Sequence, residues 1–458
     1  MLKKVGIRTA DAHFHCRSCP RSVLNARRAQ RTYPFHLCSP AQYAIITGNV
    51  QLQREHNMLS STHYPTASLK PRREESLQSG HLWIFSGALQ QPPYWIEPGG
   101  LVDVKSATGQ FVARGYYNPR TDIAIRILTR DIDEAIDIDF FRRRMRSAVE
   151  SRQVFDPNRT NAYRLVNSEG DGLPGLIVDR FAEVLVAQMH TAGMERLRPF
   201  LIEALMEETR ARGLLLRNDS QSRRREGLEV EEPVVAAGGV PTRVTVREND
   251  VLFLVDPWQG QKTGFFLDQR DKRAALRKYA HAKRVLNCFS YTGGFSIYAA
   301  LTSDKTRVTS VDISASAIED AREHFVLNSI DPNQHQFLIA DVFDFLEQAR
   351  QGGEQFDVVV LDPPAFAKTQ SARTQALKAY RRLNALGMQV LRPGGILLTC
   401  SCSGVIGMDD LLGAVAQGAQ RLQRTVQLLE SYTHSVDHPI NIAMPETAYL
   451  KAVFCRVN

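Results

Sequence analysis

The sequence has little cysteine and no long hydrophobic run, and each absence excludes a class of protein. Seven cysteines are scattered along 458 residues, which is too few and too dispersed for a disulfide framework. No apolar stretch approaches the ~20 residues that a membrane-spanning helix requires, and no apolar segment follows the basic start, so no secretory signal is expected. We therefore expect a cytoplasmic protein without a membrane partner.

Net positive charge is also small beyond the start of the chain. The net charge is +8, but residues 1–57 contain nine basic and two acidic residues and so account for seven of these charges. This segment has no regular hydrophobic period. Its one Cys-x-x-Cys pair, Cys16 and Cys19, lacks the second ligand pair of a structural zinc site. We expect residues 1–65 to be a disordered or spuriously translated extension, with Met58 as the working start, and we expect no metal site.

Three segments with different patterns follow this extension. Residues 66–135 contain short strand-like runs between Gly and Pro turns, which predicts a small β-barrel. Residues 136–243 begin with a helical pattern and continue with strands and a second helix, which predicts a central α/β module. Residues 244–458 alternate strands and helices, and this alternation predicts an α/β domain with a mainly parallel sheet.

Acidic residues stand at the predicted carboxyl ends of successive strands in the third segment. Asp312 and Asp341 end two strands, and Asp362 ends another directly before two prolines. Gly293 and Gly294 follow the first strand and allow a tight turn close to a ligand. Asp312 lies where an acid can bind the ribose hydroxyls of a nucleoside cofactor, and Asp341 lies where adenine would bind. The predicted cofactor-binding residues are Phe289, Tyr291, Thr292, Gly293, Gly294, Asp312, Asp341 and Asp362.

Two other interpretations of this pattern explain less of it. A single Asp at a strand end is more often a helix cap than a ligand, but three at one sheet edge fit the crevice where open α/β sheets bind ligands. A dehydrogenase would carry a Gly-x-Gly-x-x-Gly turn after the first strand, and it gives no reason for the two prolines after Asp362. The pattern therefore favours a class I methyltransferase that uses S-adenosylmethionine.

Cys400 and Cys402 indicate which atom is methylated. They lie two residues apart on one predicted strand and share a face, with Cys402 nearer the carboxyl edge and Asp362. A free cysteine is usually a small buried hydrophobe, but here a thiol has a chemical use. Carbon 5 of a pyrimidine becomes nucleophilic when a thiolate adds to carbon 6, and an acid that protonates N3 assists this addition. The predicted catalytic residues are therefore Asp362 and Cys402, which its position favours, although spacing alone does not decide between Cys402 and Cys400 as the nucleophile. The target is cytosine or uracil.

Eight motifs in the sequence together form a specific pattern: His81–Gly87, Glu169–Leu176, Lys262–Asp271, Leu286–Phe295, Asp362–Pro364, Ser401–Gly404, Asp437–Pro439 and Tyr449–Lys451. In these motifs the chain resembles the bacterial ribosomal large-subunit RNA (cytosine-5-)-methyltransferase I family. The resemblance covers residues 69–458 and implies a PUA barrel, a central module, a Rossmann-like methyltransferase domain with a seven-stranded sheet, and 5-methylcytosine in 23S rRNA as product. It also implies that Cys402 is the nucleophile. Residues 1–57 have no counterpart in the family, and Ala365 replaces a commonly basic residue.

Some features keep two interpretations. Lys262–Asp271 is either a wall over the cofactor or an ordinary lead-in helix, and Asp437-His438 more often packs the last strands than reaches RNA. A uracil-C5 enzyme and a non-catalytic PUA-type RNA-binding protein stay as alternative functions. The base that removes the C5 proton is not identified, and the oligomeric state is open, a homodimer included. Basic clusters usually form solvated surface; those expected to contact RNA are Arg72, Arg73, Arg223, Arg224 and Arg225.

Overall fold

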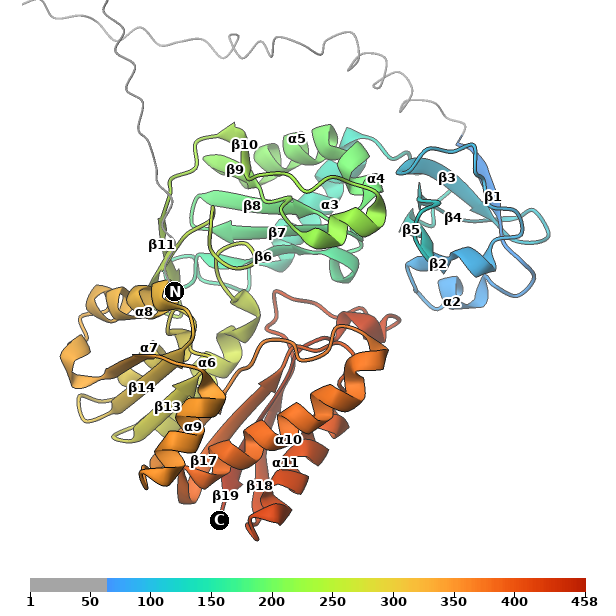
Figure 1. The fold of residues 1–458 in the computed structure, drawn as a ribbon. Helices are drawn as coiled ribbons and strands as arrows, with labels where there is room; N and C mark the ends of the chain where they lie inside the picture. Colours follow the sequence, from blue (N-terminus) through green and yellow to red (C-terminus); the bar gives the residue numbers. More distant parts are fainter. Residues whose placement is uncertain (1–63) are drawn as a thin grey trace, which may run out of the picture. The chain divides into compact units, whose positions relative to one another are not determined.

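The computed structural model describes residues 64–458 (Figure 1). The predicted extension lies outside this range except for Tyr64 and Pro65, and these two residues belong to the fold. The Pro65 carbonyl accepts a hydrogen bond from Asp103 N at 2.8 Å, and the Arg114 guanidinium lies 4.2 Å from the centre of the Tyr64 ring. Within residues 64–458, no helix is long and apolar enough to cross a membrane, and no group of three or more His, Cys, Asp or Glu residues could hold a metal ion.

The first part is a five-stranded sheet with the order β1-β3-β4-β5-β2. Its short strands, separated by turns, agree with the strand-like runs predicted for residues 66–135. Strand β1 pairs in parallel with β3, and the other pairs are antiparallel. Val102, Val104, Ile125 and Ile127 are completely buried beneath it. The elements are β1 Thr66–Ser68, α2 Glu75–Gln78, β2 Trp83–Phe85, β3 Gly100–Lys105, β4 Phe111–Tyr117 and β5 Ile123–Thr129.

The second part is another five-stranded sheet, with the order β10-β9-β8-β7-β6. Helix α3 begins where the sequence predicts, because the Asp137 side chain accepts a hydrogen bond from Phe140 N and caps the first turn. Its apolar face buries Phe140, Phe141 and Met145 completely. The elements are α3 Ile138–Ser151, β6 Ala162–Asn167, β7 Leu176–Phe181, β8 Val184–Met189, α4 Ala192–Arg196, α5 Arg198–Thr209, β9 Gly213–Leu216 and β10 Val234–Gly238.

The third part begins with the hairpin of β11 Val244–Glu248 and β12 Val251–Val255 and continues as a seven-stranded sheet, β15-β14-β13-β16-β17-β19-β18. All neighbours are parallel except β19, which is antiparallel to β17 and β18. The predicted mainly parallel sheet is confirmed. Its elements are α6 Arg270–Ala280, β13 Arg284–Cys288, α7 Gly294–Ala300, β14 Arg307–Asp312, α8 Ala315–Leu327, β15 Gln336–Ile339, α9 Val342–Gln351, β16 Phe356–Leu361, α10 Arg373–Gln389, β17 Leu391–Ser401, α11 Met408–Arg421, β18 Val426–Tyr432 and β19 Lys451–Val457.

Helices cover both faces of this sheet, and the strand sequences explain why. Successive side chains of a strand point to opposite faces. In β16, Val358 and Val360 therefore pack in one core with residues of α6, α7 and α8, whereas Val359 and Leu361 pack in a second core with residues of α9, α10 and α11. A strand buried on both faces needs the continuous apolar run that β16 has.

Asp437 is the centre of a buried ionic cluster that joins the second and third parts. Its carboxylate lies 3.0 Å from the Arg270 guanidinium and accepts hydrogen bonds from Arg164 N at 2.9 Å and His438 Nδ1 at 3.1 Å. Asp437 and His438 are 1% and 2% exposed. The neighbouring arginine keeps the pKa of the Asp437 carboxyl well below its usual range despite burial. The interpretation of this motif as packing is confirmed.

Asp437→Asn should lower the free energy of unfolding by about 3–5 kcal/mol, because it leaves the buried Arg270 charge without its main partner. The matched control is Asp250→Asn at an exposed ion pair with Arg159, which should cost less than about 1 kcal/mol. Urea unfolding of both variants measures the difference. Equal midpoints for Asp437→Asn and the wild-type protein would show that the cluster does not stabilise the fold.

Candidate active site

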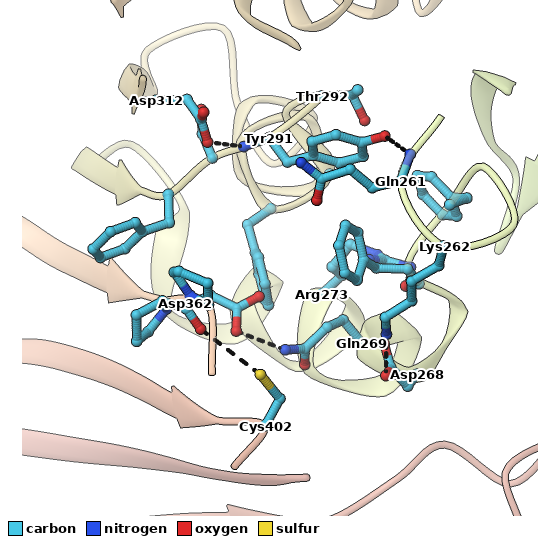
Figure 2. A pocket seen from close by; sticks show the side chains of 18 of the residues that line it. Gln261, Lys262, Asp268, Gln269, Arg273, Tyr291, Thr292, Asp312, Asp362 and Cys402 are labelled. Atoms are coloured by element: carbon cyan, nitrogen blue, oxygen red, sulfur yellow. Dashed lines mark hydrogen bonds and ion pairs between the residues drawn. The ribbon is translucent and has the colours of Figure 1, made fainter. Parts of the chain in front are cut away.

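The carboxyl ends of β13, β14, β16 and β17 surround a cavity of about 250 Å³ (Figure 2). Loops after these strands form one side, and the segment from Gln261 to Arg273 forms the other. Five of its twenty lining residues are aromatic. The lining residues are Gln261, Lys262, Phe265, Phe266, Asp268, Gln269, Arg273, Phe289, Ser290, Tyr291, Thr292, Gly294, Phe295, Asp312, Ile313, Asp362, Pro363, Pro364, Cys402 and Leu450.

The loop between β13 and α7 is held in a strained shape by Asp312. Phe289 and Tyr291 adopt φ values of 56° and 47°, in the left-handed region that non-glycine residues rarely occupy. The Asp312 carboxylate accepts hydrogen bonds from Tyr291 N at 2.8 Å and from Ser314 N at 2.9 Å. At Gly293, where φ is 79°, a Cβ atom would lie 2.9 Å from the Ala321 side chain. This turn therefore requires glycine, and it brings backbone close to the cavity.

Most of the predicted cofactor-binding residues line this cavity. Phe289, Tyr291, Thr292, Gly294, Asp312 and Asp362 are among its lining residues, and Gly293 shapes the turn behind them. Asp341 does not line it. Its side chain is exposed and accepts hydrogen bonds from Phe343 N and Asp344 N at the start of α9, as a helix cap does. Its contact with adenine stays a prediction.

Asp362 is poised between its protonated and ionised forms. Burial and the nearby Asp268 carboxylate raise the pKa of Asp362 to about 6, against the opposing charges of Lys272, Lys262 and Arg273. Gln269 Nε2 donates a hydrogen bond to Asp362 Oδ1 at 2.8 Å, which fixes one oxygen. A carboxyl group with this pKa can donate or accept a proton near neutral pH.

Cys402 lies just past the end of β17, which stops at Ser401, and its thiol lines the cavity. Its Sγ is 3.9 Å from the carbonyl oxygen of Pro363, the residue that follows Asp362 (Figure 2). Burial and the Asp362 carboxylate raise the pKa of this thiol to about 11. Cys400 is completely buried in the core. Among the cavities of residues 64–458, it lines neither of the two that Cys402 lines. The two cysteines therefore occupy different environments.

The segment from Gln261 to Arg273 supplies most of the site residues that strand ends alone did not identify. Lys262, Phe266 and Gln269 all line the cavity. Phe265 and Phe266 line the cavity, and α6 begins at Arg270, so the segment contains both a cavity wall and the start of a helix. That this wall lies over the cofactor stays a prediction. The motif Lys262–Asp271 was the sequence signal for these residues, but residue spacing does not show where their side chains point. Arg273 forms an ion pair at 2.6 Å with Glu248, the last residue of β11 before its turn to β12.

A second cavity of about 580 Å³ adjoins the first and shares only Lys262 and Cys402 with it. The central sheet and its following loop supply most of the second cavity. Its lining residues are Arg164, Ile177, Gln188, His190, Arg217, Asp219, Ser220, Lys262, Cys402 and Tyr449. A third cavity, about 730 Å³, shares Arg164, Ile177, His190 and Tyr449 with the second and reaches Trp83 and Arg120 of the first sheet.

The five arginines predicted to contact RNA differ in their exposure to solvent. The prediction for Arg223 is wrong: it is 1% exposed, donates to the Glu229 and Met189 carbonyl oxygens and pairs with Glu195 at 3.0 Å. The other four, Arg72, Arg73, Arg224 and Arg225, are exposed. Arg225 lines the third cavity. A run of like charges does not reveal which member turns inward, and this is why sequence missed the difference.

Asp312→Ala should weaken binding of S-adenosylmethionine by ~1.5–3 kcal/mol, the range for losing hydrogen bonds to a charged group. The variant removes both the acceptor for the ribose and the tie that holds the loop at Tyr291. Isothermal titration calorimetry measures the loss, and Asp344→Ala on the exposed face of α9 is the control. Unchanged affinity would mean that Asp312 acts only within the loop and does not bind the cofactor.

Comparisons with known proteins agree with this arrangement. A family model described as S-adenosylmethionine-dependent methyltransferase matches residues 232–454, and one described as a PUA-like domain matches residues 68–130. The chain is 41% identical over 386 residues to ribosomal RNA large subunit methyltransferase I of Erwinia tasmaniensis, which covers 84% of this chain and 97% of that protein. The protein of the same name from Aliivibrio fischeri is 40% identical with the same coverage.

Two solved structures share the fold. One, described as a methyltransferase complexed with SAH, has a TM-score of 0.75 at 22% identity and covers 86% of this chain and 100% of its own. Another, described as a SAM-dependent methyltransferase from Streptococcus mutans, has a TM-score of 0.73 at 22% identity with the same coverage. The expected PUA-like domain, methyltransferase fold and S-adenosylmethionine cofactor are confirmed. The chain therefore belongs to the ribosomal RNA large subunit methyltransferase I family and uses S-adenosylmethionine.

Proposed function

We propose that this protein methylates carbon 5 of a cytosine in 23S ribosomal RNA, with Cys402 as nucleophile and Asp362 as the acid. The observation that carries this proposal is the position of Cys402, which lines both the cofactor cavity and the adjoining cavity. The relatives' name supports ribosomal RNA of the large subunit as the substrate. A thiol at the junction of two cavities has a role in C5 methylation that N-methylation would not need.

The cofactor cavity suits S-adenosylmethionine in its chemistry. Asp312 offers a carboxylate to the ribose hydroxyls, Phe266 and Tyr291 offer aromatic walls, and Gly294 allows backbone to approach. A Cβ atom at Gly294 would lie 3.0 Å from the Arg273 side chain, so the space there is tight. When bound, S-adenosylmethionine supplies the methyl group. The target base would then enter from the second cavity, so that its C5–C6 edge meets Cys402.

The proton balance links Cys402 to Asp362. The Cys402 thiol passes its proton to the Asp362 carboxylate and its sulfur bonds to carbon 6, while the carboxyl group formed in this way delivers that proton to N3. The resulting enamine-like C4–C5 bond takes the methyl group at carbon 5. A base then removes the C5 proton, the released electron pair restores the C5–C6 bond, the C6–S bond breaks, and N3 returns its proton to Asp362. Before the attack on carbon 6, the Cys402 thiol and the Asp362 carboxyl group therefore share a single proton.

Cytosine fits this chemistry better than uracil. N3 of cytosine is a hydrogen-bond acceptor and needs a donor, whereas N3 of uracil carries a proton and needs an acceptor. The raised pKa of Asp362, about 6, keeps a protonated carboxyl accessible near neutral pH, and this form donates. Uracil methylation would instead use the ionised carboxylate. The non-catalytic alternative is disfavoured because both Cys402 and Asp362 line the cavity.

The three adjoining cavities suggest a path for the RNA. They run from the cofactor site past His190 and Tyr449 to Trp83 and Arg120 of the PUA-like domain. Aromatic side chains stack on unpaired bases in many RNA-binding proteins. The target cytosine would be unstacked to reach Cys402, with flanking nucleotides along this path. Of the arginines predicted to contact RNA, Arg225 is the best placed to contact these nucleotides, because it lines the third cavity.

Cys402→Ala should lower the methylation rate by ~10³-fold or more, because a nucleophile works as part of a unit that fails together. Cys400→Ala should keep most of its activity and lose only ~1 kcal/mol or so of stability. The measurement is transfer of labelled methyl groups to rRNA from a deletion strain, followed by mass spectrometry of the nucleosides. 5-Methyluridine as the product, or full activity of Cys402→Ala, would contradict the proposal.

A further inference from the structure

Lys262 occupies an unusual position in the site. Apart from Cys402, it is the one residue that lines both the cofactor cavity and the adjoining cavity in the described part of the chain. The methyl group must pass between these two cavities if the target base occupies the second. Lys262 therefore brings a positive charge to the place where the reacting atoms meet, and nothing in the mechanism above uses this charge.

Two side-chain contacts and a fixed backbone conformation hold Lys262 in place. Its Nζ lies 2.9 Å from Asp268 Oδ2 and 4.5 Å from the centre of the Phe266 ring. Its backbone adopts φ 56°, a left-handed conformation that is strained for a residue with a side chain and that is often kept at functional sites. Glycine would relieve this strain, so the structure retains a lysine here at a conformational cost.

Asp268 is itself anchored, which limits the freedom of the lysine. Asp268 Oδ2 also accepts a hydrogen bond from Tyr449 OH at 2.7 Å, and Tyr449 lines the second cavity. The Asp268 side chain is almost completely buried, whereas the Lys262 side chain is 38% exposed. The ammonium group is thus tethered by a buried carboxylate and stays open to the cavities.

Two other lysines around the site donate hydrogen bonds to backbone carbonyl oxygens. Lys451 Nζ donates to the carbonyl oxygens of Ser403 at 2.8 Å and Tyr449 at 3.0 Å, and Lys272 Nζ donates to Thr433 O at 2.7 Å. Neither lysine lines either cavity. Asp362, Lys262, Asp268, Lys451, Tyr380 and Cys400 interact electrostatically with Cys402. The two cavities that Cys402 lines also hold Arg164, His190, Arg217, Asp219, Arg273 and Tyr449.

We propose that Lys262 stabilises the thiolate of Cys402 and so activates the nucleophile at the junction of the two cavities. This inference rests on the proposed function, in which Cys402 attacks the base. A positive charge near a thiol favours its ionised form. Burial and Asp362 raise the pKa of the Cys402 thiol, and Lys262 is the cation that opposes them most. Without this charge, fewer molecules would carry the reactive thiolate.

The test measures the reactivity of the thiol itself and does not depend on RNA. Alkylation of Cys402 by iodoacetamide is followed by peptide mass spectrometry across a range of pH in the full chain without cofactor. Iodoacetamide is uncharged, so loss of a lysine does not change its attraction to the site. Lys262→Met should alkylate about tenfold or more slowly at a fixed pH below the thiol pKa, with the profile moved to higher pH. Lys262→Arg should restore most of the rate.

Three further variants control this experiment. Lys278→Met removes an exposed lysine that pairs with Glu430 and lines neither cavity, and it should leave the profile unchanged. Lys262→Gln keeps a polar group beside Asp268 and should react as slowly as Lys262→Met, which covers a failure of the methionine variant to fold. An unchanged profile for Lys262→Met or Lys262→Gln would overturn the inference, as would a shift seen only in Lys451→Met. Failure of the proposed function would appear separately, as methylation by Cys402→Ala.

Discussion

The alignment of parallel strand ends is the constraint on which this site depends. Strands β13, β14 and β16 are parallel neighbours in one sheet, and their carboxyl ends reach the same edge. Asp312 and Asp362 therefore meet around one cavity although 50 residues separate them in sequence. The register of β16 with β17 then brings Cys402, one residue past the end of β17, beside the Asp362-Pro363 turn. None of these side chains indicates a function by itself, and the sheet brings them together around one cavity.

A buried ionic framework connects this edge to the rest of the molecule. Glu248, Arg270, Arg273 and Asp437 join the β11–β12 turn, α6 and the loop before the last strand. Buried charges of this kind contribute little net stability, but they are costly to break and fix one geometry. The same helix, α6, follows Lys262 and Gln269, which contact Asp268 and Asp362. The framework thus positions the polar wall of the cavity as well as the domains.

The sequence predicted the sheet well, and it predicted many of the residues that line the cavity, because both follow from regular patterns. Strands that alternate with helices predicted a parallel sheet, and Asp312 and Asp362 at the ends of β14 and β16 therefore share one edge of it. Asp341 shows the limit of this argument, since an acid at a strand end serves equally as the cap of α9. Arg223 shows another, because neighbours in a basic run can point in opposite directions. Lys262 could not be assigned from spacing, because its role depends on side-chain directions in an irregular segment.

Covalent trapping tests the central claim about Cys402 most directly. RNA that carries 5-fluorocytosine at the target position would take the methyl group but could not lose fluorine as it loses a proton, so the C6–S bond would persist. Digestion and peptide mass spectrometry then locate the adduct. The account predicts an adduct on Cys402, in the wild-type protein and in Cys400→Ala alike. An adduct on Cys400, or no adduct in either protein, would contradict it.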